Sequence, residues 1–161
     1  MRRKQVALVR PAQVRQLAEM RGCAADSVVV MTSRQVEQTI ATLASVTAVN
    51  AIAGSVYGLS GAPNVPHEWL EGSPFEDYTV PSVILGVAVG GSSATAAAAA
   101  WVGHRAAGPT SVLAGVVLSG WIAAQVAIIG TRSFLQPVMG GVGITMIALG
   151  TTLRRLDERA R

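Results

Sequence analysis

Residues 111–130 read SVLAGVVLSGWIAAQVAIIG, and this stretch decides the fold class of the chain. It contains no Asp, Glu, Lys or Arg, and its clearly polar side chains are Ser111, Ser119 and Gln125. About 20 helical residues, at about 1.5 Å each, cross a hydrocarbon core of about 30 Å. A helix of a soluble bundle needs a polar outer face, which this stretch lacks. The stretch is therefore predicted to span a lipid bilayer.

Three further stretches, 38–67, 78–104 and 133–153, also lack charged side chains. Each exceeds about 18 residues, the length at which an apolar run becomes a spanning candidate. Of the whole chain, 14% is charged and the mean hydropathy is +0.44, whereas a soluble domain carries about 25% charged residues. The sequence thus predicts an all-α membrane protein, an antiparallel four-helix transmembrane bundle with helices at about 39–59, 80–102, 110–130 and 134–153.

Charge counts predict the orientation. With a cytoplasmic N-terminus, the lead 1–38, the turn 103–109 and the tail 154–161 hold 12 cations on the inside, and Arg132 alone lies outside. Cytoplasmic segments are enriched in Lys and Arg, so an N-in, C-in topology is expected. The domain organisation is then a basic cytoplasmic lead (1–38), a transmembrane domain (39–153) and a basic cytoplasmic tail (154–161). Arg outnumbers Lys 12 to 1, which suggests a high-GC bacterial genome and hence the plasma membrane of a bacterium.

The net charge of +4 originates in residues 1–30, which hold six cations and two anions. No apolar region directly follows the basic start, so this lead is not read as a cleavable signal peptide. Two interpretations stay open. The segment is a mis-assigned start that precedes Met31, or it is a basic arm on anionic lipid, where each cation is worth about 1 kcal/mol. Nucleic-acid binding is disfavoured, because no aromatic residue precedes Tyr57.

Small and polar residues recur every three or four positions in the first three spans. The stripes are Thr47, Asn50, Gly54 and Gly58; Ser82, Gly86, Gly90, Ser93 and Ala97; and Ser111, Gly115 and Ser119. Small residues let helix backbones approach closely in lipid, so helix packing is the favoured interpretation and a lined solute pathway is the alternative. Gly90 is expected on the packing face and Val89 is expected off it.

Asn50 and Gln125 are the amides within the spans, and each is expected to hydrogen-bond across helices. No ionisable residue lies at mid-membrane, which disfavours proton-coupled antiport. The single cysteine, Cys23, excludes an internal disulfide and a C-x-x-C pair. We expect no catalytic, cofactor-binding or metal-binding residues. The leading hypothesis is a non-enzymatic structural or accessory membrane subunit. The alternative is a small-solute or ion transporter or channel that uses the stripes, and a membrane enzyme comes third.

The segment 61–78 reads GAPNVPHEWLEGSPFEDY and joins the first two predicted spans. Ser73, Pro74 and Glu76 match a capping box, with Ser at the N-cap, Pro at the first helical position and Glu three residues beyond the cap. Aromatic rings favour the headgroup level of a membrane. An ordered loop along the outer membrane surface is therefore predicted, with Trp69, Phe75 and Tyr78 as its anchors.

The same loop carries a histidine and four carboxylates, which are His67, Glu68, Glu71, Glu76 and Asp77. Carboxylate and imidazole groups together bind metals or act as acid and base. Their spacing here matches no metal signature, so a solvated acidic surface is the favoured interpretation. Docking of a partner outside the membrane stays a hypothesis.

The block SPFEDYTVPSVILG (73–86), the alternating apolar spans and LQPVMGGVG (135–143) resemble small four-span integral membrane proteins of unknown function, of actinobacterial type. The resemblance covers residues 38–153. It implies a four-helix fold and brings no catalytic residues. Ser82 is a departure, because many relatives are expected to carry Gly there. The expected partners are the lipid bilayer, anionic lipid at the N-terminal arm, and a homo-oligomer or larger membrane complex, with no nucleic acid.

Overall fold

The computed structural model describes residues 31–63, 65, 66, 68, 74–131 and 133–160. Every helix named below belongs to one compact unit, Ser33–Arg161. Residues 1–30, on which the two interpretations of the basic lead depend, lie outside the described residues.

The Ser33–Arg161 unit is built from four apolar helical spans. They are α2 (Ser33–Leu59); a continuous span made of α3 (Thr79–Ile84), the π-helix η2 (Leu85–Gly90) and α4 (Gly91–Trp101); α5 (Ala107–Ile129); and α6 (Leu135–Arg159). Each span is long and apolar enough to cross a membrane, and the described residues contain no strand. Only 17% of the most apolar window of α5 is buried inside the protein. The remaining apolar surface needs lipid as its solvent, so the prediction of a four-helix transmembrane bundle is confirmed.

The helices extend further than the charge-free stretches. α2 begins at Ser33 rather than near residue 39, and α6 continues to Arg159 instead of ending near residue 153. Residues 154–159 read RRLDER, which contains no Gly or Pro and several good helix formers. Charged side chains mark where a helix leaves the hydrocarbon core, but the backbone hydrogen bonds of the helix continue beyond that point. The predicted basic tail is therefore helical through Arg159.

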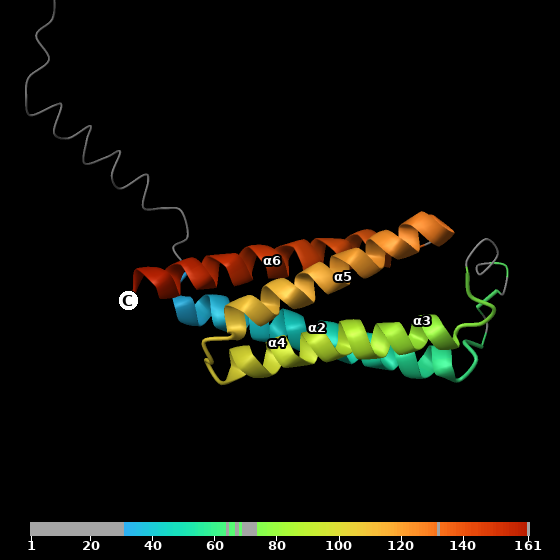
Figure 1. Cartoon of the computed structure of the whole chain (residues 1–161), viewed down its shortest axis with the longest axis horizontal. Coiled ribbons are helices and arrows are strands. Elements are labelled where there is room, and N and C mark those ends of the chain that lie inside the picture. The colour runs from blue at the N-terminus through green and yellow to red at the C-terminus, as the bar shows by residue number, and fades with distance from the viewer. Residues whose placement is uncertain (1–30, 64, 67, 69–73, 132, 161) are drawn as a thin grey trace, which may run out of the picture. The chain divides into compact units, whose positions relative to one another are not determined.

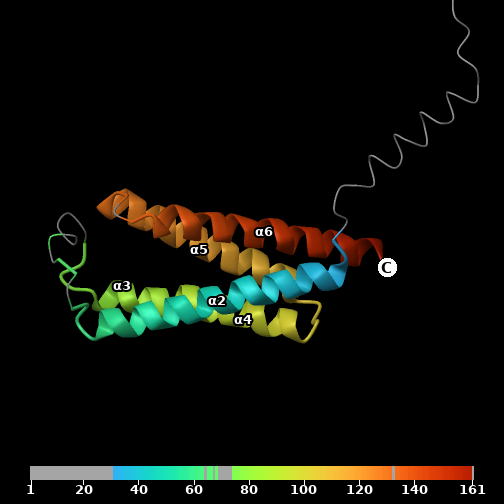
Figure 2. The same cartoon turned by 180° about the vertical axis from the view of Figure 1, so that it is seen from behind.

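The spans form two antiparallel hairpins (Figures 1 and 2). α2 lies alongside α3, η2 and α4, and α5 lies alongside α6. A short turn joins α4 to α5. In this turn Gly103 has a φ of +63°, and the amide of His104 donates to Ala99 O at 2.9 Å. A glycine in this conformation satisfies the last carbonyls of a helix at low cost, which explains why α4 stops here.

The two hairpins meet in a core at the end of the bundle that carries the α4–α5 turn. Side chains from all four spans are buried together there, namely Ala44, Ala96, Ala97, Ala114 and Met146. The hydroxyl of Ser111 donates to Met146 O at 2.9 Å and ties α5 to α6. Small residues allow these helices to pack closely, so this end of the bundle is closed.

Three glycines of the stripes lie at close helix contacts, as the helix-packing interpretation predicts. A Cβ placed on Gly58 would lie 1.8 Å from Ser82 Oγ, and one on Gly86 would lie 2.5 Å from Ser55 Oγ. Between α5 and α6 the contact is backbone to backbone, because a Cβ on Gly115 would lie 2.5 Å from Gly143 O. Each hairpin is thus held by contacts that have no room for a methyl group.

The expected contrast between Gly90 and Val89 is wrong. Both residues are buried, and Val89 is only 1% exposed. Both lie at the end of η2, where an i→i+5 turn accommodates one more residue than an α-helical turn. Two consecutive residues therefore face inward: Gly90 approaches Ile52 of α2, and Val89 packs with Ala51 and Leu118.

Candidate functional site

The two hairpins separate toward the end of the bundle that carries the α2–α3 loop (Figures 1 and 2). The burial pattern shows the same separation. Leu118 is the last buried residue of α5, and residues 119–129 of that helix are all partly or fully exposed. The contacts between hairpins are therefore concentrated in the closed half, and the loop half of the bundle has space between its helices.

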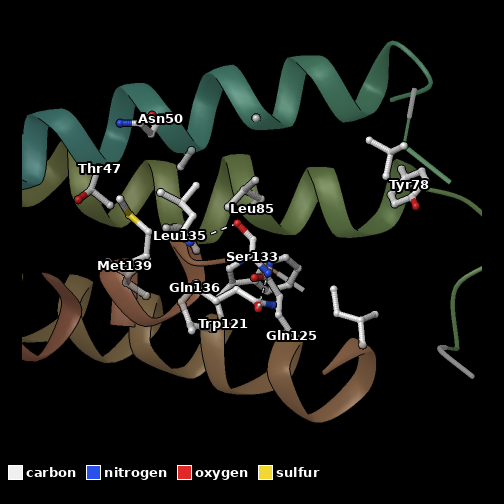
Figure 3. A pocket seen from close by; sticks show the side chains of 17 residues that line it. Thr47, Asn50, Tyr78, Leu85, Trp121, Gln125, Ser133, Leu135, Gln136 and Met139 are labelled. Atoms are coloured by element: carbon white, nitrogen blue, oxygen red, sulfur yellow. Dashed lines mark hydrogen bonds between the residues drawn. The ribbon is translucent and has the colours of Figure 1, made fainter. Parts of the chain in front are cut away.

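This space is a pocket with a volume of about 400 Å³. Both hairpins contribute to its wall, as Figure 3 shows for its labelled residues. The first hairpin and the loop contribute Thr47, Asn50, Ala51, Gly54, Val65, Tyr78, Leu85 and Val89, and the second hairpin contributes Leu118, Trp121, Ile122, Gln125, Ile129, Ser133, Leu135, Gln136 and Met139.

The pocket has a packed floor and a mouth beside the loop. Ala51, Val89 and Leu118 form a buried cluster that closes its deep end. At the mouth, the Tyr78 hydroxyl donates to Pro66 O at 2.8 Å and fixes the loop next to the start of α3. Partial burial raises the pKa of Tyr78 above its ordinary value, so this phenol stays neutral at pH 7.

The pocket brings together both amides of the spans. The expectation that they bond across helices is wrong for the described residues: Asn50 Nδ2 donates to Val46 O of its own helix at 2.9 Å, which leaves its Oδ1 as an acceptor. The Gln125 amide makes no hydrogen bond to any residue that the structure describes. Gln136 is instead structural, because its Nε2 donates to Gly130 O at 3.3 Å and closes the α5–α6 turn.

The Gln125 side chain is partly exposed, whereas two other polar atoms of α5 are fully buried without a hydrogen-bond partner among the described residues. They are Ser119 Oγ and Trp121 Nε1. Ser119 lies against Gly143, where a Cβ would be 2.4 Å from its Oγ, so close packing accounts for its position. Trp121 lines the pocket. The sequence marked Asn50 and Gln125 as polar, but it did not indicate that Trp121 or Tyr78 would share a wall with them.

The helix after the loop begins at a different residue from the one that the capping box predicted. No helix begins at Pro74, because residues 74–78 are bends and irregular backbone. Helix α3 begins at Thr79, and the Asp77 carboxylate accepts a hydrogen bond from the Thr79 amide at 2.9 Å. Pro81 then lies in the first helical turn, where a missing N–H costs nothing. Ser73, the predicted N-cap, lies outside the described residues.

The described part of the loop is held at both ends. The Tyr57 hydroxyl donates to Pro63 O, and the Tyr78 hydroxyl donates to Pro66 O. Glu68, Glu76 and Asp77 are exposed, as a solvated acidic surface requires. Among the described residues, no three His, Cys, Asp or Glu side chains lie close enough together to hold a metal ion. His67, Trp69 and Glu71 are not among the residues that the structure describes.

Comparison with protein-family models, with curated proteins and with solved structures finds no match to this chain.

Proposed function

We propose that this protein is a non-enzymatic, multi-pass membrane protein that binds an amphipathic molecule in the pocket between its hairpins. The observation that supports this most directly is the Gln125 amide, which faces an apolar pocket without a hydrogen-bond partner among the described residues. An amide without a partner in an apolar environment is costly, so a bound polar group would stabilise it. The volume of about 400 Å³ falls in the usual range of ligand sites, about 300–1,000 Å³.

Conduction of a solute has less support. Passage across the bundle would have to go through the cluster of Ala44, Ala97, Ala114 and Met146, whose side chains are at most 6% exposed. The glycines of the stripes are used for helix packing, as the close approaches of Gly58 and Gly86 show. Binding without conduction fits an accessory subunit better than it fits a channel.

The pocket matches a small molecule better than a partner helix, because its volume of about 400 Å³ lies near the lower end of small-molecule sites, about 300–1,000 Å³. A molecule with a single apolar chain or a small ring system is the size that the walls accommodate. An accessory role would therefore depend on a small bound molecule, with partner proteins contacting the exposed outer faces of the helices.

The proposal includes a location and an orientation. The resemblance to small actinobacterial four-span proteins supports the plasma membrane of a bacterium. The excess of 12 cations in the lead, the turn 103–109 and the tail, against Arg132 elsewhere, supports cytoplasmic termini. The pocket then opens toward the outer leaflet.

Reporter fusions test this orientation. A reporter fused after Glu71 is expected to signal from outside the cell, and one fused after Arg105 is expected to signal from the cytoplasm. The physical reason is the preference of Lys and Arg for cytoplasmic segments. Swapped signals from the two fusions would overturn the proposed orientation.

Binding is tested through the fluorescence of Trp121, a pocket residue. The chain has three tryptophans, so the double substitution Trp69→Phe and Trp101→Phe leaves Trp121 as the only reporter. A monoacylglycerol with a brominated chain is expected to quench this fluorescence saturably at low mole fraction in lipid vesicles. Because Trp121 is only partly buried, bulk lipid also reaches it, and saturation at low mole fraction is what identifies a chain bound in the pocket.

Two variants in this background control the experiment. Gly54→Phe is expected to abolish the saturable component, because Gly54 lines the pocket and a larger side chain would project toward Leu85. Ala53→Phe places the same ring on the exposed neighbouring position and is expected to leave the quenching unchanged. Equal, non-saturable quenching in all three proteins would mean that the probe reaches Trp121 only from bulk lipid, and the proposal would fail.

A further inference from the structure

We infer that the pocket selects an amphiphile with one apolar chain and an uncharged, hydrogen-bonding head group, and that it excludes anionic amphiphiles. This inference rests on the proposed function, because it names the class of molecule that the same pocket binds.

The polar groups of the pocket call for both a donor and an acceptor in the ligand. The Gln125 amide offers an N–H₂ group and a carbonyl oxygen, and neither has a partner among the described residues. Asn50 uses its Nδ2 on Val46 O, which leaves Oδ1 to accept. A hydroxyl or amide head group provides a donor and an acceptor in the same unit. A purely apolar molecule would leave the Gln125 amide without a partner.

The walls exclude a charged head group from the interior. Among the described residues that line the pocket there is no Asp, Glu, Lys, Arg or His. The one titratable group among the described lining residues is the Tyr78 phenol, which is neutral at pH 7 with its ordinary pKa of about 10, and burial raises that pKa further. A charge placed between these apolar side chains would lose its hydration, and none of the described lining residues carries an opposite charge.

The mouth adds a bias against anions. Tyr78 lines the pocket, and its neighbours Glu76 and Asp77 are exposed carboxylates. Glu68, which is also exposed, belongs to the same loop. An anionic head group at this position would be repelled over about 8–10 Å at physiological salt. A fatty acid or an anionic phospholipid is therefore a poor occupant.

The apolar part of the pocket indicates how many acyl chains the ligand has. Leu85 and Val89 face Leu118, Ile122 and Met139 across the space between the hairpins. The volume of about 400 Å³ lies near the lower end of ligand sites, about 300–1,000 Å³. A single chain with its head group near Gln125 matches this size.

The experiment compares two probes with identical brominated chains in the full-length protein that retains Trp121 as its only tryptophan. One probe is a monoacylglycerol and the other is an alkyl sulfate, which stays anionic at every pH used. The monoacylglycerol is expected to quench Trp121 at a mole fraction at least about tenfold lower than the alkyl sulfate, because about 1.4 kcal/mol of repulsion and desolvation corresponds to tenfold. Equal potency of the two probes would overturn the selectivity.

Two sets of variants locate the effect. Gln125→Leu is expected to weaken monoacylglycerol quenching about three- to tenfold, the usual effect of one net hydrogen bond, whereas Gln38→Leu at the distant end of α2 is expected to have no effect. The combined Glu68→Gln and Glu76→Gln variant is expected to strengthen quenching by the alkyl sulfate alone. An unchanged affinity in Gln125→Leu would overturn the role of that amide. Failure of both probes to quench saturably would overturn the proposed function itself.

Discussion

Replacing Gly115 with alanine is expected to destabilise the bundle by at least about 2 kcal/mol, a typical cost of forced overpacking. A Cβ at this position would lie 2.5 Å from Gly143 O, 2.8 Å from Ile147 Cγ1 and 3.0 Å from Ile147 N. Two of these atoms belong to the backbone of α6, so rotation of a side chain cannot relieve the contact. The helices have to move apart, and the hydrogen bond from Ser111 to Met146 O nearby would lengthen with them.

Gly120 provides the matched control. It lies on the same helix, and a Cβ there would meet nothing within 4 Å. Gly120→Ala is expected to raise stability by up to about 1 kcal/mol, because alanine is the better helix former. Thermal melting in detergent measures both variants, with an expected loss of roughly 4–8 °C for Gly115→Ala, at about 2–4 °C per kcal/mol. Shifts of the same sign for the two variants would contradict the close approach of α5 and α6.

The same interface shows what the sequence could and could not reveal. The length of the charge-free stretches alone predicted the four spans, because any helix that crosses a bilayer needs about 20 apolar residues, however it packs against its neighbours. The stripes at spacing three and four located Gly115, but they missed its partners on α6. Gly143 and Gly150 are seven residues apart, as are Gly108 and Gly115 on α5. A Cβ on Gly150 would lie 2.7 Å from Gly108 O. This matched spacing on two adjacent helices was the signal that could have revealed the pairing.

Other features depend on tertiary structure that a local pattern does not contain. The predicted role of Val89 failed because η2 changes the phase of the helix within the second span. The predicted capping box is wrong, because residues 74–78 are not helical and α3 begins at Thr79, whose amide donates to the Asp77 carboxylate. The pocket was not predictable from the sequence. Its walls come from two hairpins, and their separation depends on how far along the bundle the small residues pack one hairpin against the other. Asn50 and Gln125 were recognised as polar in the sequence, but only the fold places both on one pocket.

The second large effect is expected at the contact between α2 and α3. Gly58→Ala places a Cβ 1.8 Å from Ser82 Oγ and 3.0 Å from Ser82 Cβ. The Ser82 side chain is 6% exposed and has little room to rotate. We expect a loss of about 1–3 kcal/mol, measured by melting in detergent. The Trp121 quenching assay is expected to weaken as well, because Gly54, one turn away, lines the pocket.

Removing the obstructing side chain is expected to reverse this loss. Ser82→Gly deletes both atoms that the new methyl group would meet, so the double variant Gly58→Ala with Ser82→Gly should recover most of the stability, apart from the cost of up to about 1 kcal/mol for glycine inside a helix. The coupling between the two substitutions is expected to be about 0.5–3 kcal/mol in the favourable direction, as for residues in direct contact. Gly91→Ala is the control, because a Cβ there would meet nothing within 4 Å and its combination with Ser82→Gly should be additive. Additivity of Gly58→Ala with Ser82→Gly would show that α2 and α3 do not meet at this pair of residues, and the wall of the pocket formed by the first hairpin would have to be placed differently.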